Sequence, residues 1–406
     1  MVRETAVAES PRESDDEAME SSDHPDIRAR SETPRFVVGT MTGTSIDGEL
    51  DAALVKIEGT GLRMRVTVVA THSLPLGAIA NDLRAIAAQT PLPAQEFARI
   101  SRAFGELHAL AIDELCSDAG VQPDLAVLHG QTVFHAPPLT WQLLDPWPVA
   151  VRLSCRVRYD LRSANVASGG QGAPITPLAD FLLFARDDQP TIVVNLGGFV
   201  NATLLPRRAA GTSAIRGFDL CACNHLLDTV ARARLGRPFD MDGAAAARGV
   251  CDEALAQRLA MAIAPRVEMG STRRSLGTGD EAARLVAWTL NLSESDACRT
   301  IVEGIALAIA AALRDEPSGP IIIAGGSARN QALLVALAAR SGRVVQTSLD
   351  AAGIAVGMRE AVEMAILGAL ADDGVSYCLE AVTGCASLVP DSAVIEAPRH
   401  PRTAQV

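Results

Sequence analysis

Residues 191–205 read TIVVNLGGFVNATLL. An apolar, mostly β-branched run ends in two glycines and is followed by a second apolar run, which predicts a strand, a tight turn and another strand. Residues 36–55 have the same order, with a turn of small residues at 40–48. A plan that occurs twice along one chain predicts a duplicated α/β fold.

Further strands are expected at 63–70, which alternates in polarity, and at 125–130 and 320–326, which both end in glycine. Helical periodicity is found between them, at 96–116 and 298–313. Glycine at the carboxyl end of a parallel strand lets backbone N–H groups approach a phosphate closely. Two such halves facing each other form a central cleft. The alternative is an ordinary pair of doubly wound domains in which the glycines only make turns.

The composition excludes several classes of protein. The 406 residues are 48% hydrophobic, 3% aromatic and 21% charged, which is typical of a globular chain with an aliphatic core. No apolar run reaches the roughly 18 residues of a membrane span. A net charge of −12 does not favour nucleic acid or an anionic membrane as a partner, because such surfaces attract basic fields.

The chain divides into four predicted segments: an acidic disordered tail at 1–33, an N-terminal lobe at 34–190, a C-terminal lobe at 191–390, and a second tail at 391–406. Eight cysteines are far fewer than a disulfide-stapled domain contains. No signal peptide is recognised, so we interpret these cysteines as cytoplasmic thiols.

The turn at 39–48 contains glycines, four hydroxyl side chains and Asp47. Hydroxyls in a turn after a strand can bind phosphate oxygens, and Asp47 can hold Mg²⁺ through water. A plain β-turn with a side-chain hydrogen bond is the alternative. A Gly-x-x-x-x-Gly-Lys-Ser/Thr loop is missing, so any ATP site is of another type.

Three other segments have polar or thiol side chains that need an interpretation. Residues 325–330 follow a strand and begin a helix, which suits a nucleotide's phosphate or ribose but equally a capped helix. Asp219 within 217–220 is, taken alone, more typical of a turn or cap. Cys221 and Cys223 lack a second pair of ligands at zinc spacing, so a metal role is rejected.

Together, several segments resemble the anhydro-N-acetylmuramic acid kinase family. The resemblance covers about residues 35–385. It implies the two-lobed sugar kinase, heat-shock protein and actin-like fold, with ATP and Mg²⁺ bound between the lobes. It also implies that water cleaves a 1,6-anhydro bond while the ATP γ-phosphate moves to O6. Family members often form homodimers. The segments are 43–48, 129–132, 169–174, 195–198 with Asn201, 217–219, 325–326 with Asn330, and 382–384.

The resemblance also implies roles for individual residues. Asp219 matches the family's catalytic base, which takes a proton from the attacking water. The phosphate turns are Gly43, Thr44 and Ser45, and Gly197 with Gly198; the adenosine side is Gly325, Gly326 and Asn330. Asp47 and Glu360 are the expected metal ligands. The expected sugar-binding residues are His129, Gln131, Gln171 and Asn201.

Three departures from the family pattern limit which family roles apply to this chain, and one of them is an additional residue in the first motif, at 48–51. After the catalytic Asp the family usually reads Thr-Gly-Pro-Gly-Asn, whereas residues 220–224 here are LCACN. If those glycines serve positive φ, the turn must change shape. Many members read Asp-Phe-Arg-Arg-Arg-Asp where residues 160–165 here are DLRSAN. Arginine suits a substrate carboxylate, so the loss of two arginines indicates a weaker preference for anhydromuramic acid, with neutral levoglucosan as the alternative substrate.

Overall fold

A computed structural model of the chain describes residues 33–43, 46, 48–264, 282–385 and 391–397. Two mixed sheets form its framework, one of six strands in the order β13-β7-β4-β1-β2-β3 and one of five in the order β10-β9-β8-β11-β12. The first contains β1 (Arg35–Met41), β2 (Glu49–Glu58), β3 (Arg65–Pro75), β4 (Leu125–Leu128), β7 (Arg156–Tyr159) and β13 (Ala393–Ile395). The second contains β8 (Thr191–Leu196), β9 (Phe199–Leu205), β10 (Arg216–Ala222), β11 (Ile321–Ala324) and β12 (Val345–Thr347).

The two sheets have the same topology. In the first, β1, β2 and β3 form an antiparallel meander, while β4 and then β7 add in parallel on the other side of β1. In the second, β8, β9 and β10 form the meander, and β11 and β12 add in parallel. This repeat of one strand order confirms the predicted duplicated fold.

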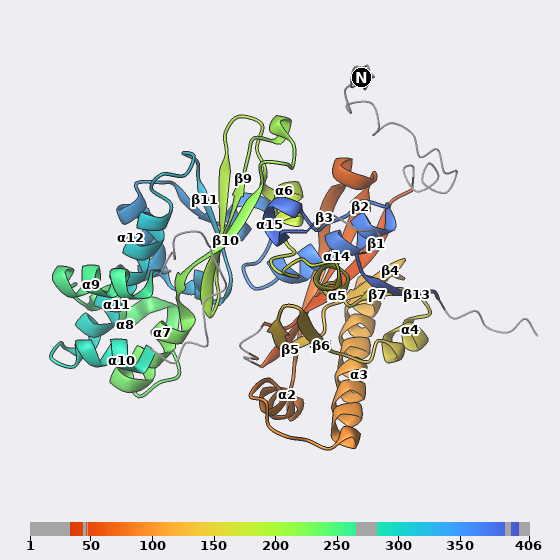
Figure 1. Cartoon of the computed structure of the whole chain (residues 1–406), viewed down its shortest axis with the longest axis horizontal. Coiled ribbons are helices and arrows are strands. Elements are labelled where there is room, and N and C mark those ends of the chain that lie inside the picture. Colours follow the sequence, from red (N-terminus) through yellow and green to blue (C-terminus); the bar gives the residue numbers. More distant parts are fainter. Residues whose placement is uncertain (1–32, 44–45, 47, 265–281, 386–390, 398–406) are drawn as a thin grey trace, which may run out of the picture.

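Helices cover both outer faces and fill the space between the sheets (Figure 1). A small hairpin, β5 (Gln131–Ala136) and β6 (Leu139–Leu143), pairs separately. The first half contains α2 (Ile79–Ala87), α3 (Ala94–Ala119), α4 (Trp147–Leu153), α5 (Ser163–Ala167) and α6 (Pro177–Phe184). The remaining helices are α7 (Asn224–Val230), α8 (Ala244–Arg248), α9 (Glu253–Ile263), α10 (Ala282–Val286), α11 (Glu294–Ala312), α12 (Gln331–Ser341), α13 (Ser348–Ala352), α14 (Arg359–Asp372) and α15 (Glu380–Thr383).

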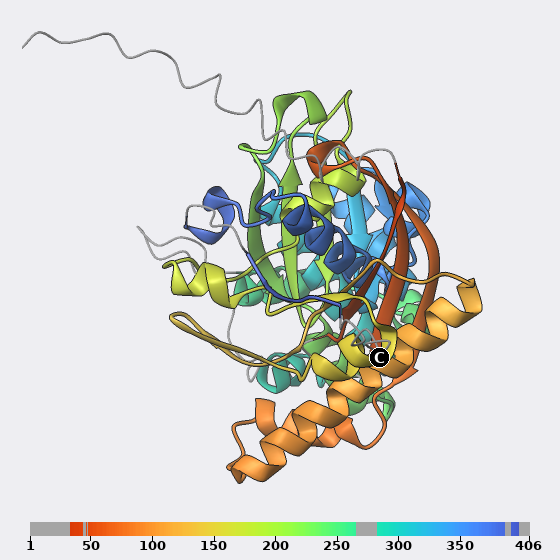
Figure 2. The same ribbon diagram turned by 90° about the vertical axis from the view of Figure 1, so that its right-hand side faces the viewer.

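The hydrophobic core has separate parts on either side of each sheet. Under the outer face of the first sheet, α3 and α4 pack on one cluster, and Figure 2 shows α3 running along that side. On the outer face of the second sheet, α7, α8, α9, α11 and α12 pack on another. Since helices cover both outer faces, the inner faces of the sheets are left for α6 and α14.

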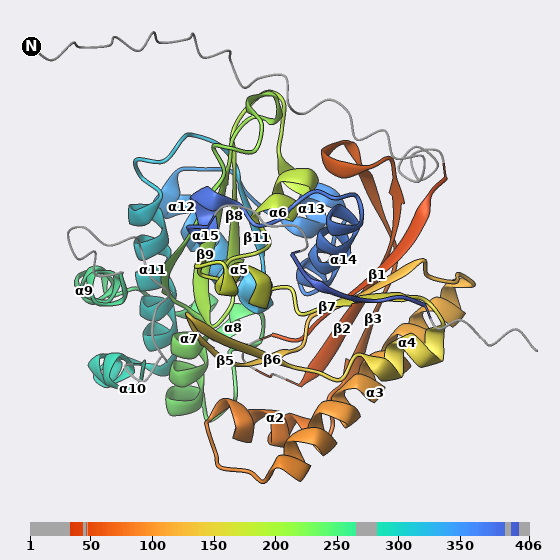
Figure 3. The same cartoon turned by 45° about the vertical axis from the view of Figure 1, so that its right-hand side comes forward.

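Both α6 and α14 lie between the two sheets (Figure 3). One buried cluster joins Val37 and Val127 of the first sheet, Val193 and Ile322 of the second, and apolar residues of both helices. The face of the second sheet that includes Val193 is therefore the one turned toward α6 and α14, and side chains at alternate positions of β8 share it.

The division into four segments stays a prediction, but two elements bear on its boundaries. Of the expected tail at 391–406, the structure describes 391–397 and places β13 there, because the apolar run Ala393–Ile395 pairs antiparallel with β7 and forms the edge of the first sheet. Helix α14, late in the chain, packs on β1 of the first sheet. Nearly all of the N-terminal tail lies outside the described residues.

Candidate active site

Three polar side chains form a row across the second sheet. Asn195 on β8 is directly opposite Asn201 on β9, and Asn201 is directly opposite Asp219 on β10. Opposed residues of antiparallel strands project from the same face. Since Asn195 is two positions from Val193, that face is the inner one, toward α6 and α14. The structure thus brings together the predicted base Asp219 and the predicted sugar-binding residue Asn201.

A β-bulge lies directly beside Asp219. The register passes from Asp219 opposite Asn201 to Cys221 opposite Val200, so that Leu220 is the additional residue. Bulges bend a strand and redirect its side chains, and they are common beside active sites. The sequence did not predict β10, because its glycine and aspartate are unusual in strands.

The two cysteines that stand where the family usually has glycine are accommodated by the core. Cys221 and Cys223 are both fully buried in the cluster behind the second sheet. Cys223 has a φ of −135°, and Cys221 is not among the described residues with positive φ. Neither position therefore needs glycine for its backbone. Burial raises the pKa of Cys223 to about 12 and that of Cys221 well above its usual value, so both are neutral thiols.

Glu360 approaches this row from the first turn of α14. Asn195 Nδ2 donates to Glu360 Oε1 at 3.4 Å. Asn195 Oδ1 is buried and has no hydrogen-bond partner among the described residues. A carboxylate and an amide oxygen at one place are ligands of the kind that Mg²⁺ takes. Asp47, the other expected metal ligand, lies outside the described residues.

The turn at Gly197 and Gly198 is fixed by the start of α7. The amides of Cys223 and Asn224 donate to the carbonyls of Gly198 and Gly197 at 2.9 and 3.0 Å. A Cβ atom at Gly198 would lie 2.7 Å from His225 Nε2, so a larger residue there would displace the imidazole. Of the other predicted phosphate turn, the structure describes Gly43, and Thr44 and Ser45 lie outside the described residues.

Gly325 brings the end of β11 against the end of β8. Its φ is +88°, and a Cβ atom there would lie 2.7 Å from Asn195 Oδ1 and 2.8 Å from the Leu196 carbonyl oxygen. Gly326 follows in a short 3-10 helix. Asn330 caps α12 by accepting from the Leu333 amide at 3.0 Å. The side-chain oxygen of Asn330 therefore has a structural role, and its predicted place beside adenosine stays a prediction.

Most of the predicted sugar-binding residues lie in the first half. Arg162 donates through Nε to His129 Nε2 at 3.0 Å and through Nη1 to the Gly172 carbonyl at 2.8 Å. Because a guanidinium only donates, His129 Nε2 must accept. Burial, and then the charge of Arg162, lower the pKa of His129 well below its usual value, so the ring is neutral. Buried Gln131 accepts from Thr42 Oγ1 at 2.9 Å.

Gln171 belongs to a loop that is tied to α15 and α5. Its amide donates to the Thr383 carbonyl at 2.8 Å, and its side chain is exposed. Asn165 on α5 accepts from the Gly172 amide at 2.8 Å and donates to Thr383 Oγ1 at 3.0 Å. Asn165 thus holds the loop through neutral contacts where many family members have an acid.

Two groups of residues are part of this arrangement although the sequence did not predict them as site residues. The sequence pattern places Asn195 only at the end of a strand. A side-chain amide directly before two glycines is the signal that could have marked it as a site residue. Buried Arg359 next to Glu360 donates to Asp180 Oδ1 at 2.5 Å and to Glu363 Oε1 at 2.7 Å. No local sequence pattern indicates that contact, since Asp180 is 179 positions away.

Comparison with known proteins identifies the family. The model of the family "AnmK: Anhydro-N-acetylmuramic acid kinase" matches residues 35–395. The chain belongs to the anhydro-N-acetylmuramic acid kinase family. It is 34% identical to the anhydro-N-acetylmuramic acid kinase of Gloeobacter violaceus, over 88% of this chain and 97% of that protein. It is 36% identical to the one of Bordetella pertussis, over 86% of this chain and 93% of that protein.

Family membership makes the chain a carbohydrate kinase. A solved ROK family glucokinase from Streptomyces griseus, in complex with glucose and AMPPNP, is 15% identical with a TM-score of 0.38, over 82% of this chain and 98% of that chain. None of the described helices has both the length and the apolar composition that crossing a membrane requires.

Proposed function

We propose that this chain is an ATP- and Mg²⁺-dependent anhydrosugar kinase that acts in cell-wall sugar recycling in the cytoplasm. In one reaction it would open the 1,6-anhydro bond of anhydro-N-acetylmuramic acid with water and phosphorylate O6, giving N-acetylmuramic acid 6-phosphate and ADP. Family membership supports the substrate. The observation that supports the mechanism is Asp219 placed opposite Asn201, in the row that Glu360 approaches.

Asp219 has the role of general base in this proposal. Water is a poor nucleophile, so a carboxylate within hydrogen-bond reach takes its proton as it attacks the anomeric carbon. The water oxygen bonds to that carbon as the bond from carbon to O6 breaks. O6 then bonds to the γ-phosphorus, and the bond to the ADP oxygen breaks. In this proposal Asn201, which lies directly opposite Asp219, orients the sugar or the water.

In this proposal the nucleotide and the metal bind at the end of the row of Asn195, Asn201 and Asp219 that lies next to Glu360. Glu360 and Asn195 Oδ1, which has no hydrogen-bond partner within the described part of the chain, would supply oxygen ligands of the kind that Mg²⁺ takes. When bound, the ion offsets charge on the phosphates during transfer. The turn at Gly197 and Gly198, fixed by α7, offers backbone amides to phosphate, and the close approach of Gly325 shapes the adjacent wall. Gly43, Thr44, Ser45 and Asp47 complete the proposed site.

The direct experiment supplies ATP, Mg²⁺ and anhydro-N-acetylmuramic acid and measures ADP together with the phosphorylated product. Water labelled with heavy oxygen adds a second readout, because the label enters at the anomeric carbon and not at O6 if water opens the ring. ADP release that depends on the sugar, with label at the anomeric carbon, is the expected result. ADP release without ring opening contradicts the coupled reaction.

A neutral anhydrosugar such as levoglucosan is the second candidate substrate. The specific observation is at α5, where Ser163 and Ala164 replace the arginines of many members, and where Arg162 already donates to His129 and to Gly172. A lactyl carboxylate then lacks a free guanidinium from this segment. The ratio of kcat/KM for the two sugars shows which one is the preferred substrate. A strong preference for the lactyl sugar excludes levoglucosan as the preferred substrate.

A catalytically decayed homologue is the candidate from a different class. Such a protein binds nucleotide or sugar, and ligand raises its melting temperature, yet no sugar-dependent ADP appears. The cysteines at 221 and 223 are the reason to consider it, and their burial behind the sheet weakens that reason.

A scaffold role rests only on the N-terminal tail, and deleting residues 1–33 should leave turnover unchanged if the tail is merely solvated. A homodimer stays a prediction.

A further inference from the structure

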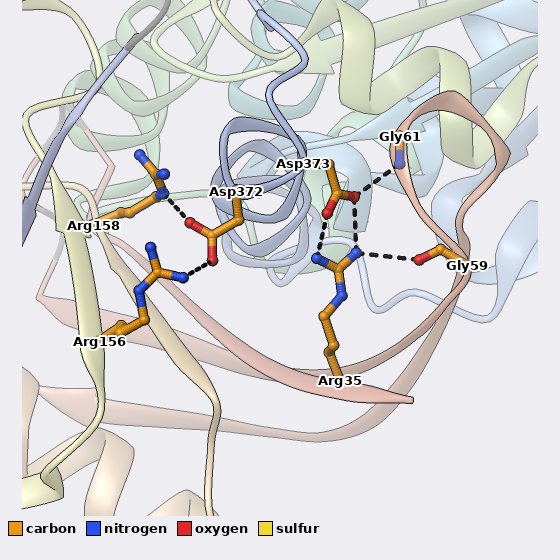
Figure 4. A network of polar contacts seen from close by, with 7 residues as sticks. All are labelled: Arg35, Gly59, Gly61, Arg156, Arg158, Asp372 and Asp373. Atoms are coloured by element: carbon orange, nitrogen blue, oxygen red, sulfur yellow. Dashed lines mark hydrogen bonds and ion pairs between the residues drawn. The ribbon is translucent and has the colours of Figure 1, made fainter. Parts of the chain in front are cut away.

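Helix α14 is fixed to the first sheet at its C-terminal end (Figure 4). Asp372 accepts from Arg156 at 2.7 Å and from Arg158 at 2.6 Å, both on β7. Asp373, the next residue, accepts from both terminal nitrogens of Arg35 on β1, at 2.6 and 2.9 Å. Charge-assisted contacts to two strands hold this end of the helix in place.

The N-terminal end of α14 packs on β1 of the first sheet, and its polar contacts reach the second sheet. Arg359 donates to Asp180 on α6 and to Glu363 one turn along α14. Thr203 on β9 donates to the other carboxylate oxygen of Asp180 at 2.9 Å. We call these four residues the Arg359 cluster. Arg359, Asp180 and Glu363 are 3%, 1% and 0% exposed, so the charges are removed from water.

A buried ionic cluster of this kind is weak support for stability, since desolvation offsets much of the attraction. Burial raises the pKa of Glu363 well above its usual value, so Glu363 holds a proton in the folded protein. Directed hydrogen bonds in such a cluster admit few geometries, and that suits fixing one element against another.

The cluster adjoins the proposed site on both sides. Arg359 is next to Glu360, which accepts from Asn195. Thr203 is two positions from Asn201 on β9 and so shares its face, the face of Asp219. The contacts from Arg359 through Asp180 to Thr203 therefore join the first turn of α14, which holds Glu360, to β9, which holds Asn201.

We propose that Arg359 is a positioning residue, which through Asp180 and Thr203 fixes the first turn of α14, and with it Glu360, against the strand that holds Asn201 opposite Asp219. The inference rests on the proposed function only for its kinetic consequence. The geometric consequence, a restrained first turn of α14, holds whatever the substrate is.

The mildest test compares two buried threonines of the second sheet. Thr203→Val removes the hydroxyl that donates to Asp180 and keeps the shape of the side chain. Thr191→Val is the matched control, because Thr191 is 0% exposed and its hydroxyl has no partner among the described residues. Thr203→Val should lower kcat roughly 3- to 10-fold, the scale of one hydrogen bond, with little change in the KM of the sugar. Thr191→Val should leave both constants unchanged.

Variants at the two ends of α14 separate positioning from stability. Arg359→Lys keeps the charge but loses the guanidinium fork, and it should lower kcat about 10-fold or more. Arg35→Met breaks the contact with Asp373 at the far end, and it should lower the melting temperature without lowering kcat. Glu363→Gln imitates the protonated acid and should retain wild-type kcat. A kcat that merely follows melting temperature across these variants overturns the inference.

Amide hydrogen exchange of residues 359–363 in the unliganded full-length chain distinguishes this inference from the proposed function. Exchange there should be faster in Thr203→Val and Arg359→Lys than in Arg35→Met or Thr191→Val. If the wild-type protein releases no ADP with any anhydrosugar, the proposed function fails and the exchange data alone decide. If amide hydrogen exchange at residues 359–363 is the same in Arg359→Lys as in the wild-type protein, Arg359 does not position this turn, even if the protein is an active kinase.

Discussion

The substitution Gly39→Ala tests whether α14 must lie directly on β1. A Cβ atom at Gly39 would lie 2.1 Å from the Ala361 carbonyl oxygen and 2.4 Å from the Ala365 amide nitrogen, whereas ordinary contact begins at 3.4 Å. Both are backbone atoms of a helix, so no side-chain rotation relieves the clash. The helix must move away by about 1.3 Å, the difference between 3.4 and 2.1 Å, in an interior that has few voids.

This displacement should affect both stability and turnover. Overpacking of this kind costs about 1–3 kcal/mol of unfolding free energy. Glu360 lies on the moving turn, and a misplacement of about 1 Å near a reacting centre can reduce the rate about 10²-fold. Urea unfolding gives the first quantity. ADP release, measured at a temperature where the variant is still folded, gives the second.

Gly357→Ala is the matched control for Gly39→Ala. Gly357 lies just before α14, its φ is outside the left-handed region, and a Cβ atom added there would have no neighbour within 4 Å among the described residues. Stability and turnover should both stay at the wild-type level in this variant. If Gly39→Ala also behaves as wild type, the close contact between α14 and β1 does not position Glu360.

Two further predictions concern buried side chains. Burial lowers the pKa of His108 from 6.5 to about 3, so the unfolded chain binds a proton below pH 6.5 that the folded chain rejects, and the unfolding free energy falls as the pH drops toward 3. By pH 4.5 the unfolding free energy should have lost roughly 2–3 kcal/mol through this group. Urea titrations of His108→Asn, which keeps a partner for Thr40, should lack that part of the pH dependence. Cys223→Gly should lower the unfolding free energy by about 1–2 kcal/mol without raising turnover, because it removes a packed side chain at a position with negative φ. A gain in turnover would show that the family's glycine at this position is needed for full activity.

The sequence predicted the framework well where local pattern decides structure. The strands near 36–39, 125–128, 191–196 and 321–324 are short apolar runs that end in small or polar residues, and the structure has strands there. It did not predict β10, where glycine and aspartate interrupt the apolar run and pairing with β9 overrides local preference.

The arrangement of the candidate site depends on long-range register, which no local pattern reveals. That Asp219 and Asn195 both flank Asn201 follows from the pairing of three strands and from a bulge at Leu220. The contact of Arg359 with Asp180 joins two helices far apart in the chain and depends on how both sheets pack around them. Family resemblance, not periodicity, indicated Asp219 and Glu360.

The role of Asp219 as general base is tested by sugar-dependent ADP release in Asp219→Asn, measured alongside a titration of its ATP affinity. The amide keeps the size of the side chain but cannot take a proton from water. We expect turnover to fall by about 10²- to 10⁴-fold while ATP binds as in the wild-type protein. Near-wild-type turnover with anhydrosugar would contradict a general base at Asp219 and make Glu360 the next carboxylate to test.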